Sequence, residues 1–110
     1  LMLPRSFRPN RQLIKEALRR GLTLNSAHCR LKTLKIAPTK TPLLTVIVSN
    51  QEVRRAVQRN RLKRRVRAVL VKNRRLLKPG VAVLIFPQAK LLAASFAKLE
   101  EEIISLLSQI

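Results

Sequence analysis

Apolar and polar residues recur along the chain with two periods, which distinguish helices from strands. Near the N-terminus, Asn10 can cap a first helix, and Gly21 can end it in the left-handed conformation. The apolar residues between them recur at helical spacing: Leu13, Ile14, Ala17 and Leu18. The pattern predicts a helix of about three turns.

Two segments with strand-like patterns follow this helix. Residues 29–36 alternate imperfectly, which predicts a half-exposed strand. Residues 43–48 form a continuous apolar run rich in β-branched residues, which predicts a buried strand. Prolines at both Pro38 and Pro42 indicate a loop over residues 37–42. We expect the two strands to pair as a hairpin.

The C-terminal third contains one more strand and one more helix. The turn Pro79-Gly80 precedes a second continuous apolar run, residues 81–86. Ser95 can cap the last helix, whose apolar residues are Phe96, Leu99, Ile103, Leu106 and Ile110. The predicted order is helix, two strands, basic helix, strand, helix. This order indicates an α+β fold with helices packed on a small sheet.

The segment between the two buried strands is arginine-rich and amphipathic. At about 100° per residue, one arc holds the apolar residues Leu62, Val66, Val69, Leu70, Leu76 and Leu77. The remainder holds the cations Arg61, Lys63, Arg64, Arg65, Arg67, Lys72, Arg74 and Arg75. Val53, Ala56 and Val57 have the opposite phase. The helix is therefore predicted to start near Gln58, with Arg54 and Arg55 in a preceding turn.

The net charge of the chain indicates what kind of partner this helix binds. The chain has 24 Lys and Arg against 5 acids, a formal net charge of +19. Neighbouring cations on one helix repel each other unless an external anion relieves the repulsion. Such a surface attracts polyanions, because each neutralised phosphate releases counterions. Nucleic acid is the expected partner, and an anionic membrane surface is the alternative.

The remaining composition narrows the class of protein. A length of 110 residues favours one domain, with residues 1–9 as a basic flexible arm. No apolar run is long enough to span a membrane or serve as a signal peptide. A single cysteine, Cys29, suits a reducing cytoplasm, and we expect it to be a small buried apolar residue.

Side chains that could act in catalysis or bind a metal ion are scarce. The chain has no Asp, its only histidine is His28, and its only acids are Glu16, Glu52 and Glu100–Glu102. No Cys/His cluster has metal-ligand spacing, and no Gly-rich loop could hold a nucleotide. We therefore expect no catalytic residue, metal ligand or small-molecule substrate in the protein itself. For His28 we expect a surface position without a special role.

Residues 56–67, Ala-Val-Gln-Arg-Asn-Arg-Leu-Lys-Arg-Arg-Val-Arg, closely resemble the signature of the bacterial ribonuclease P protein component. That family typically shows Ala-Val-x-Arg-Asn-Arg-x-Lys-Arg followed by an apolar residue and Arg. The start Met2-Leu3-Pro4-Arg5, the helix before Gly21, the segment Val46-Ile47-Val48-Ser49 and the final strand and helix are similar in order. The resemblance covers essentially the whole chain.

The resemblance implies a fold and a function. The fold would be a mostly antiparallel sheet with a β–α–β crossover, left-handed in this family, in a sandwich like that of ribosomal protein S5 domain 2. The function would be that of the protein subunit of a ribozyme that removes the 5′ leader from precursor tRNA. The catalytic RNA and precursor tRNA would be its partners, with Mg²⁺ held at the RNA. The implied RNA-binding residues are Arg59, Asn60, Arg61, Lys63, Arg64, Arg65 and Arg67.

The resemblance also implies a cleft between the first helix and the sheet that holds the leader. Family members usually carry aromatic residues there, at positions that here align with Ile14, Leu18 and Cys29. Plain core packing is the other interpretation of these three residues. A Lys-Lys pair often found after the strand is here Asn50-Gln51, so Asn50 is a fourth cleft candidate. The scarcity of aromatic residues weakens base stacking in this cleft.

Two other classes of protein stay open at this point. Composition alone allows a structural RNA-binding protein, such as a ribosomal protein, equally well. A DNA-binding module is the third class, and the chain lacks a helix pair with helix-turn-helix spacing. Stimulation of leader cleavage by the cognate RNA would separate the first class from the second.

Overall fold

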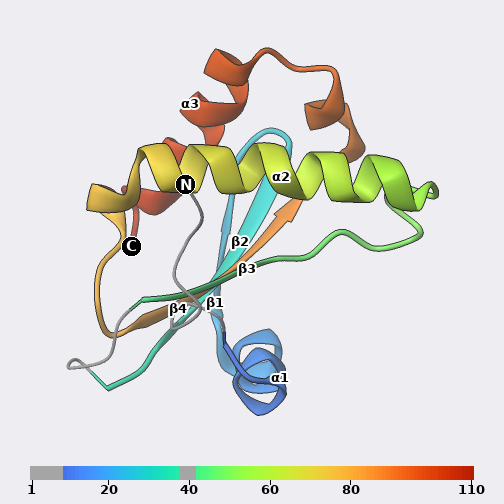
Figure 1. Ribbon diagram of the computed structural model, residues 1–110. Helices are drawn as coiled ribbons and strands as arrows, with labels where there is room; N and C mark the ends of the chain where they lie inside the picture. Colours follow the sequence, from blue (N-terminus) through green and yellow to red (C-terminus); the bar gives the residue numbers. More distant parts are fainter. Residues whose placement is uncertain (1–8, 38–41) are drawn as a thin grey trace.

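A computed structural model describes residues 9–37 and 42–110 (Figure 1). The arm predicted for residues 1–9 and the loop predicted for residues 37–42 lie almost wholly outside this range. The helices are α1 (Arg11–Arg20), α2 (Ala56–Lys72) and α3 (Phe96–Leu107), with two short 3₁₀ helices, η2 (Arg74–Leu76) and η3 (Ala89–Leu92). The strands are β1 (Leu22–Asn25), β2 (Cys29–Lys35), β3 (Leu43–Val46) and β4 (Val81–Pro87).

The four strands form one mixed sheet in the order β1-β2-β4-β3. β1 pairs with β2, and β2 with β4, in antiparallel orientation, while β3 and β4 are parallel. Because α2 joins β3 to β4, these three elements form the expected β–α–β crossover. The predicted α+β class with a mostly antiparallel sheet is confirmed.

The predicted hairpin between residues 29–36 and 43–48 is wrong. β4 lies between β2 and β3, with Leu31 of β2 and Val46 of β3 both opposite Ile85. The central position suits β4, because four successive residues, Ala82 to Ile85, are buried and such a strand needs cover on both faces. The hairpin partner of β2 is instead β1, a short strand with exposed residues that the pattern did not predict.

Helices cover both faces of the sheet (Figure 1). Leu31, Val46 and Ile85 pack with residues of α2 and α3 in the main core, and we call this side the α2 face. Leu84 points to the opposite side and is buried there beneath α1, which contacts β2 and β4. We call this side the α1 face. The α2 face is therefore covered by α2 and α3, and the α1 face by α1.

The N-terminal end of α1 is set as expected, and its C-terminal end is not. Asn10 caps the helix as predicted, since its Oδ1 accepts a hydrogen bond of 2.8 Å from the N–H of Leu13. Gly21 follows the helix with φ −69°, so the predicted left-handed conformation is wrong. Glycine is needed there because a Cβ would overlap the carbonyl oxygen of Ala17 and approach that of Thr33 to 3.1 Å. The left-handed glycine of the described chain is Gly80, with φ 78°.

α2 begins and ends earlier than its pattern predicted. It begins at Ala56, two residues before Gln58, because its first turn extends beyond the core and leaves Val57 76% exposed. It ends at Lys72, and Leu76 lies in η2 and is 40% exposed. The predicted apolar arc is thus confirmed for its first four members, which are all buried: Leu62, Val66, Val69 and Leu70.

The C-terminal helix agrees with its pattern at its centre, whereas Phe96 at its start is 39% exposed and Ile110 lies beyond its last residue, Leu107. The Ser95 hydroxyl accepts a hydrogen bond of 3.2 Å from the N–H of Lys98, as a cap should. Leu99, Ile103 and Leu106 are completely buried against the α2 face. α3 and α2 therefore form a helical layer that holds α2 with its basic side outward.

Candidate nucleic-acid interface

The outer side of α2 is a continuous basic surface. Arg61, Arg64 and Arg67 are exposed, Asn60 is exposed beside them, and Lys63 is partly exposed. Among the described residues, ion pairs join only His28 to Glu102 and Lys72 to Glu100. The charges of Arg61, Arg64 and Arg67 are therefore not neutralised by a carboxylate of the described chain. We call Asn60, Arg61, Lys63, Arg64 and Arg67 the α2 basic surface.

Arg65, which the resemblance placed among the RNA-binding residues, is engaged within the protein. Its Nη1 donates to the carbonyl oxygens of Leu91 and Leu92 at 2.6 and 2.8 Å. Its Nη2 donates to the carbonyl oxygen of Ala94. Three of the five guanidinium N–H groups thus fix the end of η3 and the residues that follow it to α2. The sequence pattern shows a cation on a helix and gives no sign of this contact.

Arg59 has a similar but smaller internal role. Its Nη1 donates to the carbonyl oxygens of Val53 and Arg54 at 2.9 and 2.7 Å. Val53 is buried, so these bonds hold the turn that leads from the core into α2. Arg59 keeps three N–H groups for another partner. The arginine therefore both shapes the start of α2 and borders the α2 basic surface.

The side of α2 that faces α3 is partly neutralised. Lys72 Nζ lies 3.2 Å from a carboxylate oxygen of Glu100 and 5.6 Å from the centroid of the Phe96 ring. The side-chain amide of Asn73 donates to Glu100 at 2.9 Å. The hydrogen bonds from Asn73 and Lys72 lower the pKa of Glu100. Among the described cations of α2, Lys72 is thus the one that forms an ion pair with a carboxylate of α3.

The four cleft candidates do not gather at one place. Ile14 is half-buried on α1, and Leu18 on the same helix is 42% exposed. Cys29 is 2% exposed and packs in the core of the α2 face, since it points to the same side as Leu31. The placement of Cys29 in a cleft with α1 is therefore wrong, and plain core packing holds for it. Asn50 lies exposed in the turn after β3.

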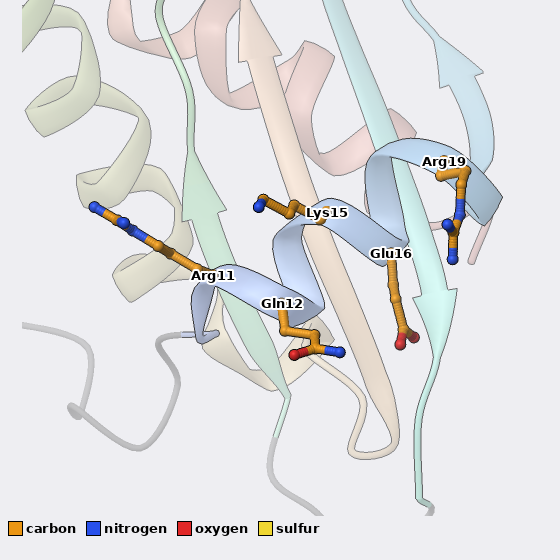
Figure 2. A pocket seen from close by; sticks show the side chains of 5 residues that line it. All are labelled: Arg11, Gln12, Lys15, Glu16 and Arg19. Carbon is orange, nitrogen blue, oxygen red and sulfur yellow. The ribbon is translucent and has the colours of Figure 1, made fainter.

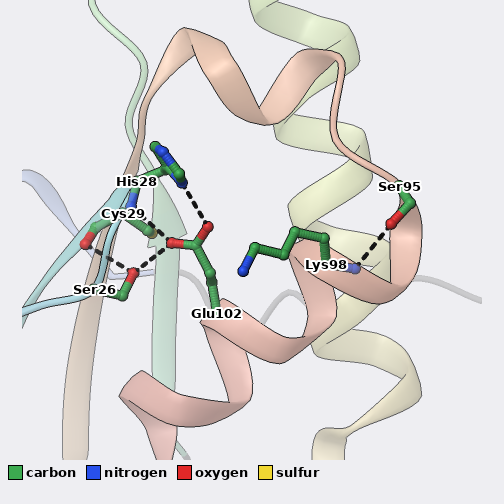
Figure 3. Close-up of polar contacts among 6 residues, drawn as sticks. All are labelled: Ser26, His28, Cys29, Ser95, Lys98 and Glu102. Atoms are coloured by element: carbon green, nitrogen blue, oxygen red, sulfur yellow. Dashed lines mark hydrogen bonds and ion pairs between the residues drawn. The ribbon is translucent and has the colours of Figure 1, made fainter.

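A polar cluster that the sequence did not reveal joins the β1–β2 turn to α3 (Figure 3). The carboxylate of Glu102, 5% exposed, accepts hydrogen bonds from the Ser26 hydroxyl at 2.8 Å and the His28 N–H at 2.7 Å. His28 Nδ1 lies 3.0 Å from the other carboxylate oxygen. Burial raises the pKa of Glu102, but these hydrogen bonds outweigh it and leave the pKa below its ordinary 4.5. The expectation of no special role for His28 is wrong, because the residue holds this turn.

Beside this cluster, Cys29 behaves as the buried apolar residue that was expected. Burial, together with the negative charge of Glu102, raises the pKa of its thiol to about 12. The thiol is therefore protonated at neutral pH and closed to solvent.

The outward side of α1 carries a second group of cations. A shallow open hollow is lined by Arg11, Gln12, Lys15, Glu16 and Arg19 (Figure 2). Arg11, Lys15 and Arg19 are four residues apart, so consecutive cations lie about 6 Å apart along the helix axis. The protein thus presents cations on two opposite sides of the sheet.

No group of three or more His, Cys, Asp or Glu side chains within residues 9–37 and 42–110 could hold a metal ion. In the same part of the chain, no helix has the length and apolar content needed to cross a membrane.

The comparisons with known proteins agree with this geometry. Residues 8–110 match the model of the family described as Ribonuclease P. No sequence among the curated proteins matches the chain. Among solved structures, the chain resembles the RNase P protein from Thermotoga maritima with a TM-score of 0.83 and 23% identity, over 94% of this chain and 96% of that one. It resembles the RNase P protein of Staphylococcus aureus with a TM-score of 0.78 and 14% identity, over 94% of each chain.

The chain is a small basic protein with an exposed arginine-rich helix, and its fold is that of the solved RNase P proteins. The match over nearly the whole length shows that the chain belongs to the ribonuclease P family. It is a protein subunit of a tRNA-processing endoribonuclease whose catalytic component is RNA.

Proposed function

We propose that the chain docks on the catalytic RNA of ribonuclease P through the α2 basic surface. The observation that carries this proposal is the row of exposed, carboxylate-free side chains at Asn60, Arg61, Arg64 and Arg67. Arginine suits this partner, because its planar fork can bind two phosphate oxygens at once. Arg65 then has a structural role, whereas Arg59 both holds the start of α2 and keeps N–H groups for the RNA.

The second proposed partner is precursor tRNA, whose 5′ leader would lie along the α1 face. The cations Arg11 and Lys15 and the partly exposed apolar side chains of Ile14 and Leu18 support this placement. Cys29 takes no part, since it lies on the other face. The protein would act in the cytoplasm, where precursor tRNA is processed.

Magnesium would belong to the RNA. Three of the five acids are already engaged: Glu52 accepts from the N–H of Ala89, Glu100 from Lys72 and Asn73, and Glu102 from His28 and Ser26. Mg²⁺ prefers oxygen ligands such as phosphates and carboxylates, and this cation-rich chain offers few. The protein's own contribution would be to bind and orient RNA and to neutralise phosphate charge.

Reconstitution tests this proposal. The protein is mixed with the cognate catalytic RNA and precursor tRNA at low magnesium, and removal of the leader is measured. We expect the protein to stimulate cleavage strongly under these conditions. No stimulation at any magnesium concentration would refute the proposal and favour a structural RNA-binding protein.

A further inference from the structure

β1 lies at one end of the sheet and pairs with β2 alone. In the turn that joins the two strands, the N–H of Ser26 donates to the carbonyl oxygen of Cys29 at 2.8 Å. Residues of an antiparallel pair alternate between bonding to the partner strand and pointing away from it. Counted back from Ser26, the N–H and C=O groups of Thr23 and Asn25 therefore point away from the sheet. We call this outward side of β1 the β1 edge.

The β1 edge is open among the described residues. No hydrogen bond from another described residue reaches the outward backbone groups of Thr23 and Asn25. β1 also lacks the residues that usually protect an edge, since none of its four residues is charged or a proline. Leu22 is 65% exposed, whereas β3, the strand at the other end of the sheet, has no large apolar residue that is exposed. β1 is thus the edge that is open to pairing with another strand.

The two sides of the β1 edge differ in chemistry. Leu24 lies opposite Leu31 of the main core, so Leu24 and Leu22 point to the α2 face. On the α1 face, Arg19 and Arg20 end α1 directly before the chain enters β1, and both are exposed (Figure 2). A strand added here would therefore meet apolar side chains on one side and cations on the other.

We propose that the β1 edge binds an extended acidic segment of a partner protein, which adds to the sheet as a further strand. The outward groups of Thr23 and Asn25 would form the ladder hydrogen bonds, and the alternating side chains would give specificity. Every second side chain of the segment would be apolar and would lie beside Leu22. The side chains between them would be acidic and would lie near Arg19 and Arg20. The inference does not depend on the proposed function.

Charge favours an acidic segment over the other possible occupants. No carboxylate of the described residues forms an ion pair with Arg19 or Arg20, and Glu16, four residues before Arg20, is included in this statement. A second copy of this chain would bring a further net charge of +19 to the edge. RNA would be attracted to the arginines, but it has no alternating N–H and C=O groups with which to complete a β ladder.

A synthetic peptide tests the ladder and the charge separately. The probe is a fluorescent octapeptide of alternating valine and glutamate, and the matched probe has lysine in place of glutamate. Thr23→Pro removes an outward N–H and leaves the bonds to β2 in place, while Thr23→Val keeps that N–H and serves as the control. Arg20→Gln removes one of the cations. Affinity is measured by fluorescence anisotropy at low salt, and circular dichroism checks that each variant is folded.

We expect Thr23→Pro to weaken binding of the acidic peptide by about 5-fold or more, as loss of one backbone hydrogen bond does. Thr23→Val should bind as the wild type does, and Arg20→Gln should weaken binding by about 2-fold or more. The lysine peptide should bind more weakly than the acidic one. In the wild type, the acidic peptide should slow hydrogen exchange at the amides of Thr23 and Asn25, a result that does not require any variant to fold.

Several results would overturn the inference. Equal affinity of Thr23→Pro and Thr23→Val for the acidic peptide, or unchanged exchange at the two amides, would show that no strand is added. A wild-type dimer in sedimentation that Thr23→Pro abolishes would give the edge to a second copy of the chain.

RNA is tested as the occupant in the reconstituted holoenzyme. Thr23→Pro and Thr23→Val should support leader cleavage equally, because the β1 edge is separate from the α2 basic surface. A loss of cleavage with Thr23→Pro alone would assign the edge to RNA and overturn the inference. If the wild-type protein itself does not stimulate cleavage, the proposed function is wrong, and the peptide measurements still decide whether the β1 edge adds a strand.

Discussion

The carboxylate of Glu102 lies 3.0 Å from Nδ1 of His28, although 74 positions separate the two residues in the chain. The contact ties the β1–β2 turn to α3, and thus one end of the sheet to the helical layer. Because Glu102 is almost fully buried, its charge must be balanced by the hydrogen bonds that it accepts from Ser26 and His28.

Glu102→Gln should therefore destabilise the protein. The variant keeps the size of the side chain but weakens three hydrogen bonds to a charged acceptor, so we expect a loss of about 1–3 kcal/mol in the free energy of unfolding near pH 7. Urea unfolding followed by circular dichroism measures it. Glu101→Gln, an exposed neighbour on the same helix, is the control. Equal stability of the two variants would contradict a structural role for the cluster.

The same carboxylate predicts a dependence on pH. The pKa of Glu102 is lower in the folded protein than its ordinary 4.5, so the folded state holds its proton less tightly than the unfolded state. Its contribution to stability is complete above the ordinary pKa and is lost as the pH falls through the folded pKa. Between about pH 5 and pH 3, the wild type should lose stability more steeply than Glu102→Gln. If the stability of the wild type and of Glu102→Gln fell equally with falling pH, the folded state would not favour the ionised form of Glu102.

Arg64 and Arg65 are neighbours in sequence, but we expect their substitution by alanine to have different effects. One variant should lose RNA affinity and the other should lose stability. Arg65→Ala removes three hydrogen bonds to the carbonyls of Leu91, Leu92 and Ala94, so we expect a loss of about 1–3 kcal/mol in stability. Arg64→Ala removes an exposed cation and should change stability by about 0.5 kcal/mol or less. Its effect should appear instead in the affinity for the catalytic RNA. If Arg65→Ala left stability unchanged and lowered RNA affinity as much as Arg64→Ala, the structural role of Arg65 would be wrong.

The thiol of Cys29 should be unreactive in the folded protein. A buried thiol with a pKa of about 12 has almost no thiolate at neutral pH and no path for a reagent. We expect negligible labelling by a thiol reagent in the native state and complete labelling in denaturant. Rapid native labelling would show that the Cys29 thiol is open to solvent, as its place among the leader-cleft candidates would require.

Local patterns predicted the helices and the main strands well. The capping side chains of Asn10 and Ser95 were identified correctly because a cap depends on residues three positions apart. Strand neighbours were not predicted correctly, because pairing depends on which strand is buried on both faces, and this becomes visible only when the layers are assembled. The sequence nevertheless held one usable clue, since the continuous apolar run of β4 suits a central strand.

The candidate site was predicted in outline and corrected in detail. Alternation along β2 could have placed Cys29 with Leu31 in the core, whereas the resemblance placed it in the cleft. The roles of Arg65 and His28 could not be predicted, because their partners lie on distant segments that no local pattern connects to them. The basic side of α2 was identified correctly because helical periodicity alone separates it from the buried side.

The central claim is that the α2 basic surface docks on the catalytic RNA, and its salt dependence tests this most directly. If the protein neutralises about 6–10 phosphates, affinity should fall by about 10³–10⁵ between about 50 and 200 mM salt. A variant with Lys63, Arg64 and Arg67 changed to Ala should bind more weakly, with a slope of log affinity against log salt reduced by about 2–3. A variant with Arg11, Lys15 and Arg19 changed to Ala loses the same charge on the opposite side and should keep the wild-type slope. Equal reductions in both variants would contradict docking through α2 and indicate a general attraction to polyanions.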